Sequence, residues 1–344
     1  MDNRYVGRLL KLVFVGALVA GVMAAGLLGG RNVALAQDTE AQTFIVEAGD
    51  LGYANVEALQ FAPQNLQIHR GDTVIWHLNG FHNIRFASAP VDLVIAPEVE
   101  GQPLPQINPI VGLPSIESDG TYQGGELGSG LPQGISGTFS LMMDVEPGTY
   151  SYVCDVHPGM LGTITVVDDA TAIPAPAEAA ATGAEELDAS LNAGIGVMFE
   201  MLASTPMMTE GDELPVTVGS PGIGRATIHA FFPFNGVIQA GQSVTWTNPA
   251  DSIDPHTVTW PPRDPAEDVM PIEQEGGPPI LALGENLLGN TQSGAEVGAD
   301  GAFHSGLLLP GQSFTLTFTE AGVYPYVCHL HPGMQGVITV QPAA

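Results

Sequence analysis

The sequence predicts an all-β protein made of two tandem Greek-key β-sandwiches, joined by a linker that contains a short helix. Three observations lead to this class. The 344 residues include 43 glycines and 28 prolines but only 13% charged residues, which favours short strands and turns over long helices. Short segments rich in β-branched and aromatic residues recur along the chain. The chain also carries an internal repeat, which indicates a duplicated domain.

The first 36 residues have the pattern of an export signal. Arg4, Arg8 and Lys11 form a positive region, an uncharged stretch follows over residues 12–30, and an A-x-A sequence precedes residue 37. Residues 1–36 are therefore predicted to be a signal peptide. The alternative is an uncleaved N-terminal anchor, because the apolar stretch is long enough to span a bilayer. Either way, we expect the rest of the chain to be exported, to the periplasm or the extracellular space.

The repeat divides the rest of the chain. Residues 151–166 and 325–340 are identical at eleven of sixteen positions, and residues 61–86 parallel residues 231–260. The spacing from an upstream histidine to the repeated cysteine is 72 in both copies. A repeat this long is a domain and not a solenoid unit. The predicted parts are domain 1 over residues 37–168, a linker with a helix over 169–212, and domain 2 over 213–344.

The elements follow in order from local composition. In the first half we expect strands at residues 43–48, 65–69, 73–77, 83–87, 137–142, 149–153 and 162–167. In the second half we expect them at residues 214–218, 237–239, 243–247, 257–260, 313–317, 323–327 and 336–340. Between the halves, residues 168–183 are rich in Ala, Pro and Glu and indicate a linker, whereas apolar spacing over 184–204 predicts a helix that packs on a domain.

Each half also contains a long Gly- and Pro-rich segment between its histidine and its cysteine, over residues 89–134 and 261–301. Loops of this length in compact domains are usually functional or mobile. We expect them to shape the surface on which a partner docks.

The chemistry of the chain lies in a C-x2-H-x2-M motif that occurs twice, each time with an upstream histidine. The candidate metal ligands are His82, Cys154, His157 and Met160 in the first half, and His256, Cys328, His331 and Met334 in the second. One thiolate, two imidazoles and a weak thioether are the ligands of a blue-copper electron-transfer site. The alternatives for the two cysteines are a disulfide in an exported protein, buried inert thiols, or a zinc site. A disulfide does not require matched His and Met offsets, and Met is a poor zinc ligand, so copper is favoured.

On these residues, each half resembles a cupredoxin of the plastocyanin and amicyanin family. The short His-Pro-Gly-Met spacing is most similar to amicyanin. The resemblance implies a cupredoxin sandwich in each half, one type 1 copper per domain, and the eight ligands above. It also implies that Asn83 braces the cysteine loop by hydrogen bonds. Thr257 stands at the matching position in the second half, which puts that brace in doubt there.

The remaining histidines and methionines have ordinary interpretations. The histidines without an aligned partner in the other half are expected to be strand or surface residues: His69, His77, His229 and His304. His329 aligns with Asp155 and is expected to point away from the metal. Met142 and Met143 are expected to fill the core.

The function expected is electron transfer and not catalysis. After residue 36 the chain has 36 acidic residues, four arginines and no lysine, so it lacks the basic surface that nucleic-acid binding needs. Multicopper oxidases need several H-x-H pairs, copper nitrite reductases a His before the cysteine, and dinuclear copper centres a C-x3-C; Val153 and Val327 precede the cysteines here. The loop histidines His157 and His331 are expected to bring the redox centre to the surface. The acidic body would attract a basic redox protein such as a cytochrome.

Two alternatives belong to other classes. The chain could be a copper-holding or cell-surface module that carries no electrons, or a subunit of a copper oxidoreductase. Reversible redox cycling without loss of copper distinguishes a carrier from a holding module. Membrane association is expected only through the N-terminal segment.

Overall fold

The structure is a computed structural model and describes residues 40–343 apart from 54, 93, 97–103, 133, 135, 210, 222, 265–267, 275 and 299–300. The predicted signal peptide over residues 1–36 lies outside the described residues. No helix within the described ranges is long and apolar enough to cross a membrane.

Domain 1 is a sandwich of two sheets. The order of the first sheet is β14 (Ala226–Ile228), β2 (Val56–Ala62), β1 (Thr43–Asp50), β4 (Thr73–Asn79), β10 (Ser136–Met143) and β8 (Gly120–Tyr122). The order of the second is β3 (Asn65–His69), β12 (Leu161–Val167), β11 (Gly148–Val153), β5 (Arg85–Phe86) and β9 (Leu127–Gly128). Burial alternates along β4, so that one face turns to the core. Trp76 is fully buried there, edge-on to Phe86 and Tyr152.

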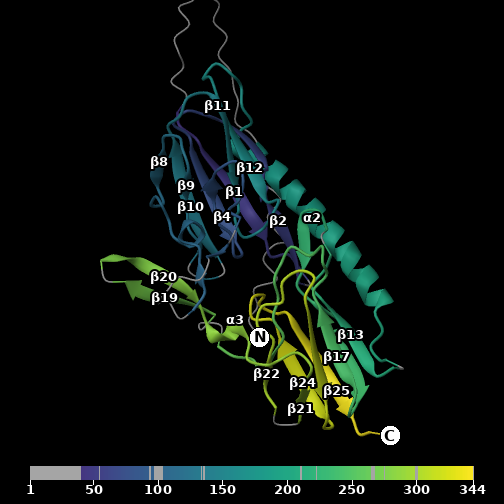
Figure 1. Ribbon diagram of the computed structural model, residues 1–344. Helices are drawn as coiled ribbons and strands as arrows, with labels where there is room; N and C mark the ends of the chain where they lie inside the picture. The colour runs from purple at the N-terminus through teal and green to yellow at the C-terminus, as the bar shows by residue number, and fades with distance from the viewer. Residues whose placement is uncertain are drawn as a thin grey trace, which may run out of the picture. The chain divides into compact units, whose positions relative to one another are not determined.

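Domain 2 repeats this arrangement (Figure 1). Its first sheet runs β15 (Phe231–Phe232), β13 (Glu213–Val218), β17 (Ser243–Thr247), β23 (Ser313–Phe318) and β21 (Ala295–Val297). Its second runs β16 (Asn235–Gln239), β25 (Gln335–Gln341), β24 (Gly322–Val327), β18 (Thr259–Trp260) and β22 (Phe303–His304). Trp246 takes the place of Trp76 and packs edge-on to Tyr326. The prediction of two tandem all-β sandwiches is confirmed.

The helix between the domains is longer than the sequence pattern predicted. α2 spans Pro176–Ser204, so it begins eight residues before the expected start and takes in half of the expected linker. Pro176 stands at the first helical position, where a missing N–H is tolerated, and the Ala-rich residues that follow are strong helix formers. Leu187, Leu191 and Met198 turn one face of the helix onto buried apolar residues of β2 and β14.

The two long insertions pair with each other. β6 (Ile95–Ala96) and β7 (Gln106–Ile107) come from the first insertion, and β19 (Val269–Gln274) and β20 (Gly277–Leu283) from the second; together they form one sheet through a β7–β20 pairing. The short helices α1 (Pro109–Gly112) and α3 (Glu285–Leu288) belong to the same insertions. Their shared apolar cluster includes Val156 and Leu330, each the residue before a loop histidine. The insertions therefore pack on the two cysteine loops.

The domains also join directly through β2 and β14. These strands pair antiparallel, with Glu57 opposite Thr227. The offset of 170 that relates Gly71 to Gly241 relates the same two residues, so equivalent strands of the two domains meet at this point. The pairing places Glu57 of domain 1 beside His229 of domain 2.

Candidate metal centres

The first centre gathers three ligand candidates from two parts of domain 1. His82 lies in the connection from β4 to β5, and Cys154 and His157 lie in the loop from β11 to β12. The Cys154 Sγ lies 3.8 Å from Nδ1 of His82 and 3.6 Å from Nδ1 of His157, and the two nitrogens are 2.9 Å apart. All three residues are buried. Three donor atoms this close surround a single position that an ion can occupy.

The second centre has the same arrangement. The Cys328 Sγ lies 3.9 Å from Nδ1 of His256 and 3.4 Å from Nδ1 of His331. Each trio holds its ligand atoms within 4.8 Å of one another. Both cysteines are free, one in each domain, so the disulfide alternative has no support in the structure.

The methionines close the same loops. The N–H of Cys154 donates to the carbonyl of Met160 at 3.0 Å, and the N–H of Cys328 donates to that of Met334 at 3.0 Å. Both methionine side chains are buried, and each belongs to the core cluster that contains the cysteine of its domain. Their role as the fourth ligand stays a prediction.

Two glycines that the sequence analysis did not single out hold the upstream histidines in place. A Cβ on Gly49 would lie 2.3 Å from Nε2 of His82, and a Cβ on Gly219 would lie 2.3 Å from Nε2 of His256. Both glycines have φ in the left-handed region, at 78° and 73°. Each imidazole edge therefore packs directly against a glycine, and any other residue there would force the ring or the backbone to move.

In domain 1 the cysteine loop is braced as the family resemblance implied. Asn83 Nδ2 donates to Asp155 Oδ2 at 2.9 Å, and the N–H of Asp155 donates to Asn83 Oδ1 at 2.8 Å. The carboxylate of Asp155 also accepts from Nε of Arg85 and from the N–H of Val91. Asp155, the residue after Cys154, is thereby hydrogen-bonded both to the segment that contains Asn83 and Arg85 and to the start of the first insertion at Val91.

In domain 2 a threonine replaces this brace. The N–H of Thr257 donates to Cys328 Sγ at 3.3 Å, and Thr257 Oγ1 accepts from the N–H of His329 at 2.8 Å. Thr257 therefore braces the cysteine loop of domain 2, with fewer hydrogen bonds than Asn83 and Asp155 make in domain 1. His329 itself turns to Asp268, with 3.1 Å between Nδ1 and Oδ1, and is outside the ligand trio.

Burial controls the protonation of the second centre. It raises the pKa of the Cys328 thiol to about 11 and lowers the pKa of His256 to about 3. Burial also holds the pKa of His331 well below its ordinary value. The centre thus offers neutral imidazoles and a thiol that keeps its proton until a cation displaces it.

Three charged or titratable residues near the centres were not predicted from the sequence: Glu57, His229 and Asp254. Glu57 Oε1 lies 3.2 Å from Nε2 of His82. The expectation that His157 reaches the protein surface is wrong. It is 8% exposed, and its Nε2 faces Asp254 of domain 2 at 3.8 Å, although the adjacent Pro158 is exposed. His229 is equally buried and is not the strand or surface residue expected.

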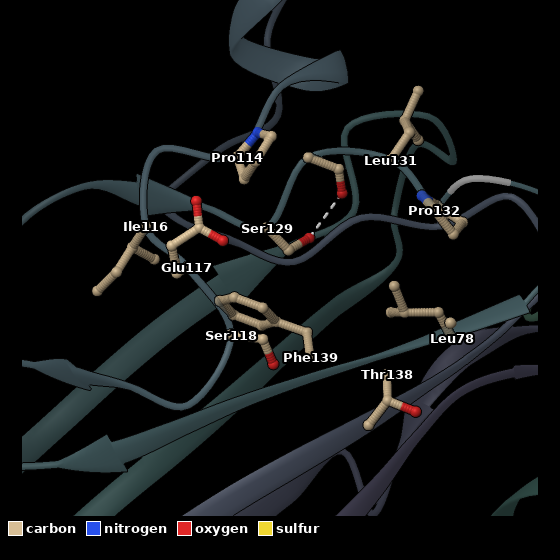
Figure 2. A pocket seen from close by; sticks show the side chains of 12 residues that line it. Leu78, Pro114, Ile116, Glu117, Ser118, Ser129, Leu131, Pro132, Thr138 and Phe139 are labelled. Carbon is tan, nitrogen blue, oxygen red and sulfur yellow. Dashed lines mark hydrogen bonds between the residues drawn. The ribbon is translucent and has the colours of Figure 1, made fainter.

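A surface hollow lies apart from both centres. Figure 2 shows its lining on domain 1, where the carboxylate of Glu117 and the hydroxyls of Ser118 and Ser129 stand around Phe139. None of the eight ligand candidates lines it. It contributes nothing to the metal centres.

Comparisons with known proteins agree with this geometry. The family model of copper-binding proteins of the plastocyanin/azurin family matches residues 49–167 and again residues 223–341. The chain therefore belongs to this family, with two copies of its domain. The resemblance to cupredoxins is confirmed, and a thiolate with two imidazoles in each domain fits one copper per domain.

Individual relatives match one domain's length of chain. A chloroplastic plastocyanin of Tetradesmus obliquus is 34% identical over 114 residues, which are 32% of this chain and 58% of that protein. A plastocyanin of Scenedesmus fuscus is 33% identical over 32% of this chain and 86% of its own length. Amicyanin from Paracoccus versutus is 22% identical with a TM-score of 0.22, covering 41% of this chain and 88% of that one. The chain thus spans little more than half of the first of these relatives.

Proposed function

We propose that this protein is an exported electron carrier with one type 1 copper site in each domain. The observation that carries the proposal is the trio of one thiol and two imidazole Nδ1 atoms, repeated in both domains and buried in both apart from the half-buried His331. Copper held there supplies a one-electron couple between Cu(I) and Cu(II). His82, Cys154, His157 and Met160 would hold the first copper, and His256, Cys328, His331 and Met334 the second.

Features of the chain itself support a carrier over an enzyme. Each centre offers four protein ligands, all buried except the half-buried His331, which leaves no open position for a substrate. The fixed loops keep the geometry similar in both oxidation states, because the cysteine and methionine ends of each loop are joined by backbone hydrogen bonds. We propose no catalytic role.

We propose a redox protein with a basic surface as the partner. The described domains carry four arginines against a large excess of carboxylates, and Arg85 is used internally by Asp155. A positively charged protein is therefore attracted over a long range. No nucleic acid is expected to bind.

The test is copper loading of residues 37–344. We expect two coppers per chain, an intense thiolate-to-copper band in the visible spectrum, and the EPR signal of type 1 copper. Cys154→Ser and Cys328→Ser should each remove one copper and leave the other band. Absence of the band in the fully loaded protein would refute the proposal.

One observation favours the copper-holding alternative. The Nε2 edge of His157 faces domain 2 and not solvent, which removes the usual contact point for a partner. Repeated electrochemical reduction and reoxidation decides between the two functions. A carrier keeps both coppers through many cycles in the presence of a Cu(I) chelator, whereas a holding module loses copper to it.

A further inference from the structure

The carboxylate of Asp254 lies buried between the two copper centres. It comes from the loop after β17 in domain 2 and is 1% exposed. Its Oδ1 lies 3.8 Å from Nε2 of His157 in domain 1, and its Oδ2 lies 3.5 Å from Nε2 of His229. A ring nitrogen of His331 lies within 4.8 Å of the same carboxylate. One carboxylate of domain 2 therefore faces the loop histidines of both domains.

The bonding of His157 requires a hydrogen-bond acceptor at the position where the Asp254 carboxylate lies. Nδ1 of His157 faces the Cys154 sulfur, so a neutral imidazole that gives Nδ1 to copper carries its proton on Nε2. That N–H is buried and needs an acceptor. Asp254 Oδ2 has no hydrogen-bond partner, and the polar groups around the carboxylate are histidine nitrogens. The two oxygens of this carboxylate thus face Nε2 of His157 and Nε2 of His229, which places it to act as an acceptor for these rings.

The same atoms do not suit a third metal ion. His229 and His331 stack face to face, with ring centroids 3.8 Å apart and an angle of 16° between the planes. Two nearly parallel rings cannot both aim a lone pair at one ion. His331 is moreover committed to the second copper through Nδ1.

Only domain 2 supplies a carboxylate at this position to the loop histidine of the other domain. The offset of 174 that relates His82 to His256 places Gly80 of domain 1 opposite Asp254. His331 therefore receives no matching carboxylate from domain 1, and it stacks on His229 instead. On the domain 1 side, Glu57 lies between His82 and His229, 3.2 Å and 3.4 Å from their nitrogens. In domain 1, Nε2 of His82 thus faces Glu57 of the same domain, and Nε2 of His157 faces Asp254 of domain 2.

We propose that Asp254 is a positioning residue for the domain 1 copper site, supplied by domain 2, and that its charge lowers the reduction potential of that site. Its carboxylate faces the Nε2–H of His157, with 3.8 Å between Oδ1 and Nε2, and the attraction between them favours this orientation of the ring. A negative charge close to the site stabilises the more positive oxidised form. The inference rests on the proposed function, because it concerns the copper that His157 would bind.

The experiment isolates the first site by using Cys328→Ser as the background. In this chain we compare Asp254→Asn with Asp251→Asn, an exposed carboxylate of the same loop. We expect D254N to raise the reduction potential of the remaining copper, so that the ratio of reduced to oxidised copper at a fixed potential rises at least about tenfold, or about 59 mV. D251N should leave the potential at the background value. Equal potentials in the two variants would overturn the proposal.

A second measurement applies if D254N does not fold or does not bind copper. In the fully loaded Cu(I) protein with ¹⁵N-labelled histidine, the Nε2–H of His157 should give a resonance that persists in water and shows an exchange rate far below that of a free imidazole. A fast-exchanging or absent Nε2–H would overturn the proposal. Failure of the proposed function is distinct, because C328S then shows no thiolate-to-copper band at all.

Discussion

Gly49 and Gly219 are the residues at which the copper centres depend most directly on backbone shape. Each lies against Nε2 of an upstream ligand histidine, where a Cβ would come within 2.3 Å of the ring. The ring is fully buried in both domains, so it has no room to move away. The imidazole proposed to bind copper is therefore positioned by a residue without a side chain.

We expect Gly49→Ala to damage the first copper site and Gly219→Ala the second. Each variant should bind one copper per chain in place of two, because the displaced imidazole no longer faces the cysteine. Copper stoichiometry and the visible spectrum measure this. Gly71→Ala is the matched control, since Gly71 also has positive φ, at 92°, but nothing lies within 4 Å of its Cβ position. Equal loss in all three variants would mean that backbone strain alone is responsible.

His304 makes the stability of domain 2 depend on pH. It is buried, its Nδ1 accepts from Thr259 Oγ1 at 2.7 Å, and its Nε2 donates to the carbonyl of Glu285 at 3.1 Å. Burial, together with Arg263, lowers its pKa from 6.5 to about 4. The unfolded chain therefore takes up a proton first as the pH falls, and the folded state loses stability between pH 6.5 and 4.

The loss should approach about 3 kcal/mol at full protonation of the unfolded state. Denaturant unfolding of the copper-loaded protein at pH 7 and at pH 4.5 measures it. In His304→Gln the decrease in unfolding free energy over this range should be smaller by an amount of that order. His77→Gln, on a half-exposed histidine, should keep the full decrease. A decrease in H304Q as large as in the unsubstituted chain would contradict the assignment.

At the residue scale, the sequence indicated the ligands and the Asn83 brace but not the charged and titratable residues between the domains. The eight candidates stand out because thiol, imidazole and thioether recur at equal spacing, and the structure brings each Cys and its two His together. Glu57, His229 and Asp254 carry no such signal, since no residue of the same type stands at their matching positions. Their positions depend on how the two domains pack.

At the element scale, α2 connects the two sandwiches by a single apolar face. Leu191 is buried, with its methyl groups near Gly52, and belongs to the cluster that unites β2 and β14. Phe199 of the same helix is 62% exposed. The helix therefore stabilises the β2–β14 pairing by packing on both strands.

We expect Leu191→Ala to lower the free energy of unfolding by about 2–5 kcal/mol, because it leaves a cavity under the helix. Phe199→Ala should change it by less than about 0.5 kcal/mol. Chemical denaturation followed by circular dichroism provides both values. Equal effects of the two substitutions would show that the helix does not pack as described.

The strand boundaries show where local composition was sufficient to predict a strand and where it was not. The residue ranges 65–69 and 243–247 match β3 and β17, whose apolar residues alternate with polar ones. β2 was missed, because Glu57, Ala58 and Gln60 are uncommon in strands. All seven of its residues are buried, since α2 and β14 cover it, and that burial is a tertiary effect.

At the scale of the whole molecule, duplication was visible in the sequence but the joining of the copies was not. The repeat predicted two similar domains because similar segments recur at offsets of 170 and 174 residues. The β2–β14 pairing and the shared sheet of the two insertions involve residues without an aligned signal. His157 of domain 1 faces Asp254 of domain 2, a contact that the repeat by itself did not predict.

The charge of the molecule leads to a prediction about its reaction rates. The chain has a net charge of −29, and the part after residue 36 is more negative still. We expect reduction of the copper-loaded protein by a cationic one-electron reagent such as hexaammineruthenium(II) to slow by about tenfold or more as the ionic strength rises from 10 mM to 0.5 M, because salt screens the attraction. Reduction by anionic ferrocyanide should become faster over the same range. Stopped-flow loss of the visible band measures both rates, and the opposite slopes separate charge attraction from a general salt effect on the site. Slopes of the same sign for both reagents would show that the acidic surface does not act at the place where electrons enter.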